Sequence, residues 1–194
     1  KGVAIKKPIS LSAFTTKDLA AFKIASRKNI NNYALSFCNK KEDITQIKKK
    51  IPKGANIIAK IESQSGFKNC KEICQSADSI LIDRGDLSKE FDIEEIPKIQ
   101  KEITKVAKQQ KTKIYVATNF LESMIDKPFP NRAEINDIYN TLIDGVDGLV
   151  LAAETAIGKY PLESASIIKR IFKSFNHPNE KKNYLNKYSE IKKF

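Results

Sequence analysis

Cysteine is scarce in this sequence of 194 residues, which contains only Cys38, Cys70 and Cys74. So small and odd a set does not form a disulfide framework. Cys70 and Cys74 lie four positions apart on a predicted helix, with no neighbouring cysteine or histidine to complete a zinc site. We therefore expect all three cysteines to be buried or chemically inert.

Long apolar runs are also absent. No stretch approaches the roughly 20 apolar residues that a transmembrane helix needs. The first residues, KGVAIKKPIS, lack the apolar core of a signal peptide. With 41% hydrophobic and 30% charged residues, the composition predicts a soluble, globular, cytoplasmic protein with no membrane partner.

Acidic residues are outnumbered, and the formal net charge is +12. Such an excess raises nucleic acids or small anions as partners. However, the lysines are spread over predicted helix faces and the last residues of the chain, without interleaved aromatics or a nucleic-acid-binding motif. A solvated surface is the better interpretation, and a nucleic-acid partner is disfavoured.

Strand-like and helix-like patterns alternate along the chain. The predicted strands span residues 33–37, 56–62, 79–84, 113–118 and 148–152. Four of them are continuous apolar runs, as expected for strands that are covered on both faces. Strict alternation predicts an α/β fold with parallel strands and right-handed helical crossovers.

Chemically suggestive residues fall at or just beyond the carboxyl ends of these strands, where parallel α/β folds build their sites. They are Ser36, Lys60, Glu62, Asp86, Thr118 and Glu154. Because alternate residues of a strand share a face, Lys60 and Glu62 should project together.

Glu62 ends one predicted strand and Asp86 follows the next. Neighbouring strands lie about 5 Å apart in a sheet, so the two carboxylates should reach one divalent cation. Simpler interpretations stay open for each residue. Lys60 and Glu62 could form a surface salt bridge, Asp86 could cap the helix that follows Gly85, and Thr118 could pack a strand end.

Five segments together resemble the pyruvate kinase family over nearly the whole chain. They are KIES (60–63), DRGDL (83–87), ATNFLESM (117–124), NRAE (131–134) and AAETAIGKYPLES (152–164). The resemblance implies that the five strands correspond to the fourth through eighth of a TIM-type (β/α) barrel. Residues 1–177 would then be a partial barrel, and residues 178–194 a polar, lysine-rich tail or the start of a following domain.

The resemblance also implies a chemistry, the glycolytic transfer of a phosphoryl group from phosphoenolpyruvate to ADP, giving pyruvate and ATP. Glu62 and Asp86 would hold Mg²⁺ or Mn²⁺, and the complete family site also uses K⁺. Lys60 would offset charge on the phosphoryl group and the enolate, which suits a reaction that depends on positioning and charge neutralisation. Thr118 would lie beside the carbon that becomes protonated.

Further residues follow from the same resemblance. Backbone amides of Arg84, Gly85 and Asp86 would bind the substrate carboxylate, with Gly85 permitting close approach. Ser36, Asp83, Asn119 and Glu154 would support the site from around it. The complete protein would form a homo-oligomer.

The sequence departs from the usual family pattern at Asp83, Asn119 and Ala152, where alanine, glutamine and serine are usual. These departures support a second hypothesis, a degenerate relative that binds a pyruvate-like ligand or a partner without catalysis. A third is a metal-dependent aldolase or lyase acting on pyruvate enolates. Because three barrel strands and the lid have no counterpart here, we expect a portion of a longer chain or a relative completed by association, with little activity alone.

Overall fold

A five-stranded parallel sheet organises the computed structural model, which describes residues 14–175. Its strands are β1 (Asn32–Leu35), β2 (Asn56–Ile61), β3 (Ser79–Asp83), β4 (Lys113–Ala117) and β5 (Gly148–Val150). Each strand pairs in parallel with the next one along the chain. The predicted α/β fold is therefore confirmed, and the sequential parallel order is that of a partial TIM-type barrel.

The predicted strands begin within one residue of the observed ones but run one or two residues too far. The excess residues lie in the connections that leave the sheet, and Glu62 and Thr118 are among them. Their side chains are therefore available to build a site, although the Thr118 N–H still donates to the Val150 carbonyl at 3.4 Å.

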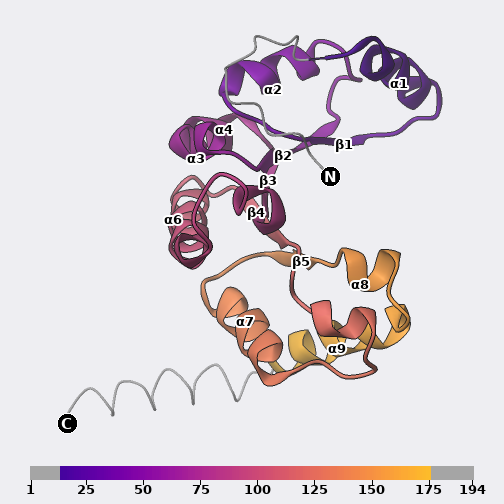
Figure 1. Ribbon diagram of the computed structural model, residues 1–194. Helices are drawn as coiled ribbons and strands as arrows, with labels where there is room; N and C mark the ends of the chain where they lie inside the picture. The colour runs from indigo at the N-terminus through magenta and orange to yellow at the C-terminus, as the bar shows by residue number, and fades with distance from the viewer. Residues whose placement is uncertain (1–13, 176–194) are drawn as a thin grey trace.

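The connections between strands are helical, and Figure 1 shows them following a crescent from α1 to α9. They are α1 (Thr16–Arg27), α2 (Lys41–Lys48), α3 (Gln64–Lys68), α4 (Cys70–Ser76), α5 (Arg84–Leu87), η1 (Ile93–Glu95), α6 (Ile96–Gln109), η2 (Glu122–Ile125), α7 (Arg132–Ile143), α8 (Ala153–Ala156) and α9 (Pro161–Phe175). Thr15 caps the start of α1, because Thr15 and Asp18 form a reciprocal capping box.

The core lies between the central strands and the helices that cover them. In β3 the first four residues are buried, as a strand covered on both faces requires. Helix α6 contributes Ile99, Ile103 and Ala107 to this core, and Val106 is partly buried against it. A fully buried isoleucine side chain contributes about 1.5–3 kcal/mol to the free energy of folding.

The cysteine prediction is confirmed: Cys38, Cys70 and Cys74 are free and buried. Burial, together with the charge of Asp43, raises the pKa of the Cys38 thiol to about 12, so it stays protonated at neutral pH. Cys70 and Cys74 place their sulfur atoms 3.8 Å apart on α4.

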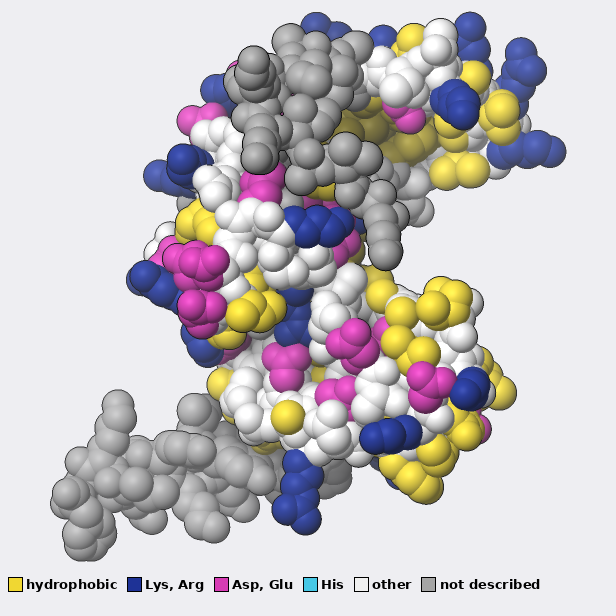
Figure 2. All heavy atoms as spheres, in the orientation of Figure 1, with side chains coloured by type: hydrophobic (Ala, Val, Ile, Leu, Met, Phe, Trp, Pro, Cys, Tyr) yellow, Lys and Arg dark blue, Asp and Glu magenta, His cyan; other side chains and the backbone are white. Residues whose placement is uncertain are grey.

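Surface charge is mixed on the face seen in Figure 2, where basic side chains are interspersed with acidic ones and hydrophobic side chains gather near α8 and α9. Leu162 is 79% exposed and Ile157 is 78% exposed. Within residues 14–175, no helix is both long and apolar enough to cross a membrane. The tail expected at 178–194 lies outside the described residues.

Candidate active site

Three carboxylates meet at the carboxyl edge of the sheet. Glu62 follows β2, Asp83 ends β3, and Asp86 lies in the short helix α5. One oxygen atom from each lies within 4.8 Å of the others. The structure thus brings Glu62 and Asp86 together and adds Asp83 to them.

Lys60 lies between two of these carboxylates. Its Nζ is 2.6 Å from Glu62 Oε1 and 3.2 Å from Asp83 Oδ2. Glu62 is only 1% exposed, and its Oε2 accepts a hydrogen bond of 2.6 Å from the backbone N–H of Phe37. The Lys60–Glu62 ion pair therefore exists, but it belongs to a larger cluster rather than to an isolated surface salt bridge.

The electrostatics of this cluster follow from burial and from the crowding of like charges. Burial raises the pKa of Glu62, and the charge of Asp83 acts in the same direction, against the opposing contacts of Lys60 and Phe37. Burial alone would lower the pKa of Lys60, but the hydrogen bonds and charges of Glu62 and Asp83 raise it overall. Lys60 therefore stays protonated at neutral pH.

Asp86 projects from inside α5. The residue that caps this helix is Asp83, so the interpretation of Asp86 as the cap is wrong. Asp86 instead forms an ion pair with Lys89, whose side chain is 60% exposed. Lys89 is a component that the sequence analysis missed, although its position three residues after Asp86 on a helical turn could have indicated it.

Thr118 lies next to the carboxylates at the end of β4. Its hydroxyl oxygen accepts a 2.9 Å hydrogen bond from the Gly85 N–H and donates to the carbonyl of Ala117 at 2.6 Å. The Gly85 amide, which the sequence suggested for substrate binding, is thus engaged with Thr118. The hydroxyl is held by hydrogen bonds rather than merely packed at a strand end.

Arg84 fixes the backbone of Thr118. Its Nε donates to the Thr118 carbonyl at 3.1 Å, and its Nη2 donates to the same oxygen. Its Nη1 lies 2.7 Å from Asp137 Oδ2, and its guanidinium carbon lies 4.1 Å from the ring centroid of Phe120. The Arg84 side chain is therefore fully occupied in holding protein groups, which the sequence did not predict.

The other predicted supporting residues are less central. Glu154 is buried, and its Oε2 accepts the Ala152 N–H at 2.9 Å, while its Oε1 has no hydrogen-bond partner among the described residues. Asn119 is exposed and donates to Glu122 at 3.0 Å. Ser36 is exposed in the turn after β1, where it is the next residue, Phe37, that contacts Glu62.

The carboxylate cluster fits a hard divalent cation. Carboxylate oxygens are the ligands that Mg²⁺ and Mn²⁺ prefer. Opposite oxygens around Mg²⁺ lie about 4.2 Å apart, because each Mg–O bond is about 2.1 Å. A separation of up to 4.8 Å between the three oxygens is therefore close to what one ion requires.

The parallel sheet and the polar cluster at its carboxyl edge define the class of (β/α)-barrel proteins with a site at the strand ends. The family model for the pyruvate kinase barrel domain matches residues 1–165. This chain belongs to the pyruvate kinase family.

Individual relatives agree with that assignment. A pyruvate kinase of Thermotoga maritima is 41% identical over 168 residues, covering 85% of this chain and 36% of the relative. A pyruvate kinase of Methanocaldococcus jannaschii is 41% identical over 179 residues, covering 89% of this chain and 40% of the relative. A pyruvate kinase of Clostridium perfringens is 39% identical over 178 residues, covering 89% of this chain and 38% of the relative. The chain thus spans about two fifths of the length of these curated relatives.

Proposed function

We propose that this chain provides the cation-binding and charge-neutralising part of a pyruvate kinase, which transfers a phosphoryl group from phosphoenolpyruvate to ADP. The observation that carries the proposal is the convergence of Glu62, Asp86 and Lys60 at one edge of the sheet, in a chain of this family. Two carboxylates and one ammonium group supply the charges that such a transfer needs.

Each residue then has a definite task. Glu62 and Asp86 would hold Mg²⁺ or Mn²⁺, which when bound would neutralise charge on substrate oxygens. The ammonium group of Lys60, kept protonated by its two carboxylate neighbours, would offset negative charge on the phosphoryl group and on the enolate that it leaves. The hydroxyl of Thr118 would face the carbon that takes up a proton to give pyruvate.

The test is to replace the ammonium group while leaving the carboxylates in place. We expect Lys60→Met to lower turnover with phosphoenolpyruvate, ADP, Mg²⁺ and K⁺ by at least about 100-fold, the loss typical of one transition-state contact. Mn²⁺ binding, followed by titration, should persist, since the ligand oxygens remain. Lys101→Met is the matched control, because Lys101 also pairs with an aspartate, Asp144, at 2.6 Å but lies away from the strand ends.

The assay should use both the 194-residue chain and the longest polypeptide that its gene encodes. We expect little turnover from the 194-residue chain alone, because five βα units do not close an eight-stranded barrel. If Lys60→Met keeps wild-type turnover in the longer polypeptide, Lys60 has no part in the transfer.

A second candidate function is that of a degenerate relative, which binds a pyruvate-like ligand without catalysis. One observation favours it, the position of Asp83. Its carboxylate lies within 4.8 Å of Glu62 and Asp86, where added negative charge opposes an anionic substrate. A degenerate relative would bind pyruvate saturably in the presence of Mn²⁺ but show no phosphoryl transfer in the same assay. An aldolase or lyase would instead require an aldehyde and no ADP.

A further inference from the structure

The backbone immediately after β4 is strained. Thr118 has φ of +75° and Asn119 has φ of +56°, both in the left-handed region. A β-branched residue such as threonine rarely adopts this conformation, which costs on the order of 1–3 kcal/mol. The conformation persists only where surrounding contacts impose it.

Arg84 supplies those contacts from the neighbouring strand end. Two of its nitrogens donate to the carbonyl oxygen of Thr118, and the next residue, Gly85, donates its N–H to the Thr118 hydroxyl. Helix α5 therefore holds the threonine at both its backbone and its side chain.

The orientation of the Arg84 guanidinium depends in turn on two groups. One face stacks on the ring of Phe120, at 4.1 Å from its centroid. The end of the guanidinium meets the carboxylate of Asp137 on α7, at 2.7 Å. Arg84 is only 10% exposed, whereas Asp137 is 39% exposed, so the ion pair holds a largely buried guanidinium in place from the surface of the molecule.

We propose that Asp137 is a positioning residue, which orients Arg84 so that Thr118 stays in its left-handed conformation with its hydroxyl against Gly85. This inference rests on the proposed function, since that assigns the Thr118 hydroxyl to the carbon that becomes protonated. Asp137 touches none of the proposed ligands or reacting atoms, and it acts through Arg84 alone. Misplacement of a reacting group by about 1 Å can cost about 100-fold in rate.

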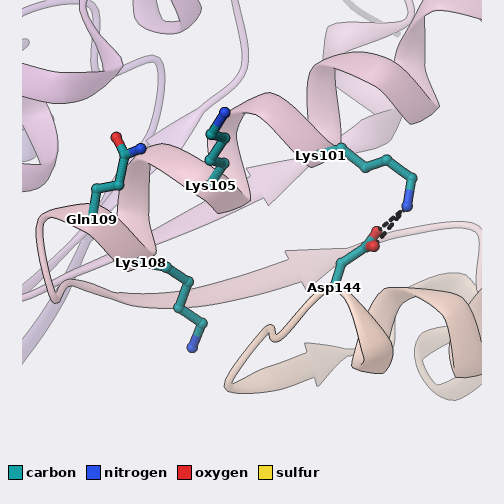
Figure 3. A pocket seen from close by; sticks show the side chains of 5 residues that line it. All are labelled: Lys101, Lys105, Lys108, Gln109 and Asp144. Atoms are coloured by element: carbon teal, nitrogen blue, oxygen red, sulfur yellow. Dashed lines mark hydrogen bonds and ion pairs between the residues drawn. The ribbon is translucent and has the colours of Figure 1, made fainter. Parts of the chain in front are cut away.

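The test compares Asp137→Ala and Asp137→Asn with a control at the C-terminal end of the same helix. Asp144, the C-terminal cap of α7, forms an ion pair of 2.6 Å with Lys101 in a groove of about 530 Å³ lined by lysines (Figure 3). Asp144→Ala therefore removes a similar ion pair without touching Arg84. Circular dichroism and urea unfolding identify any variant that fails to fold.

The first measurement is the Mg²⁺-dependent exchange of pyruvate methyl protons for deuterium, followed by proton NMR, which reports protonation at the reacting carbon without phosphoryl transfer. We expect Asp137→Ala to slow this exchange about 10- to 100-fold. Asp137→Asn should recover part of the rate, because its side-chain carbonyl still accepts from Arg84. Mn²⁺ affinity should stay within about threefold, and Asp144→Ala should match the wild type.

A wild-type exchange rate in folded Asp137→Ala would overturn the proposal, as would a loss equal to that of Asp144→Ala. The second measurement is hydrogen exchange of the Gly85 amide, which needs no activity. Both measurements use the longest polypeptide that the gene encodes, because little turnover is expected from the 194-residue chain alone. If the wild-type longer polypeptide exchanges no pyruvate protons, the proposed function fails, and hydrogen exchange of the Gly85 amide alone decides the positioning role. Faster Gly85 exchange in Asp137→Ala then supports the positioning role, and unchanged exchange overturns it.

Discussion

The carboxylates at the two ends of the same strands lie in different surroundings. At the amino end, Asp78 precedes β3 and accepts the Ile57 N–H at 2.8 Å, and Asp147 precedes β5 and accepts the Ile114 N–H at 2.8 Å. At the carboxyl end, Glu62, Asp83 and Asp86 face one another. The amino-end aspartates join neighbouring strands by hydrogen bonds, whereas the carboxyl-end acids bring negative charges close together.

The difference separates carboxylates that bind backbone N–H groups of the sheet from carboxylates that lie close to other carboxylates. A carboxylate that accepts a backbone N–H satisfies a donor that would otherwise be buried without a partner. Carboxylates that face one another destabilise the folded chain unless a cation lies among them. Glu62 combines both features, because it accepts the Phe37 N–H and also lies close to Asp83 and Asp86.

The largest effect should come from Glu62→Gln at the carboxyl end. We expect Mn²⁺ affinity to fall by at least about 10- to 100-fold, since loss of even an outer-sphere partner costs that much. The free energy of unfolding should stay the same or rise, because glutamine still accepts from Phe37 and one like charge is removed. Mn²⁺ titration and urea unfolding measure the two quantities. Unchanged Mn²⁺ affinity would show that both ends serve only the fold.

An intermediate effect is expected from Asp147→Ala at the amino end. The variant should lose about 1–3 kcal/mol in free energy of unfolding, because the Ile114 N–H loses its side-chain acceptor. Asp147→Asn is the matched control, since it removes the charge but keeps an acceptor oxygen, and it should lose less. Mn²⁺ affinity should not change in either variant. A fall in Mn²⁺ affinity would contradict the separation of the two ends.

The smallest effect should come from Lys89→Ala. Lys89 pairs with Asp86, so its removal should free that carboxylate and tighten Mn²⁺ binding about two- to fivefold, as expected for an exposed ion pair. Lys108→Ala offers the comparison at the amino end, where Lys108 lies 3.2 Å from Asp147. That variant should leave Mn²⁺ binding as it is. Weaker binding in Lys89→Ala would mean that Lys89 orients Asp86 rather than competing for it.

The sequence predicted the convergence of Glu62 and Asp86 because the geometry of parallel strands is general. Successive strands are neighbours, and their carboxyl ends meet at one edge. The same reasoning placed Lys60 beside Glu62, since alternate residues share a face. These predictions needed no knowledge of side-chain packing.

Other parts of the site depend on packing that local sequence does not encode. Asp83 was assigned to the surroundings, yet the exit of the chain into α5 turns its carboxylate toward Lys60. The contact of Phe37 with Glu62 uses a backbone N–H, which carries no side-chain signal. Asp137 meets Arg84 across 53 residues of sequence, and only the tertiary fold, which brings α7 to α5, places the two side chains together.

The left-handed backbone of Thr118 has a consequence for how the protein could be improved in the laboratory. Glycine tolerates that conformation without strain, but Thr118→Gly would also remove the acceptor of the Gly85 N–H, and the two effects on the free energy of unfolding are of similar size, about 1–3 kcal/mol each. Selection for heat resistance would therefore gain little at this position, whereas selection for turnover would keep the hydroxyl.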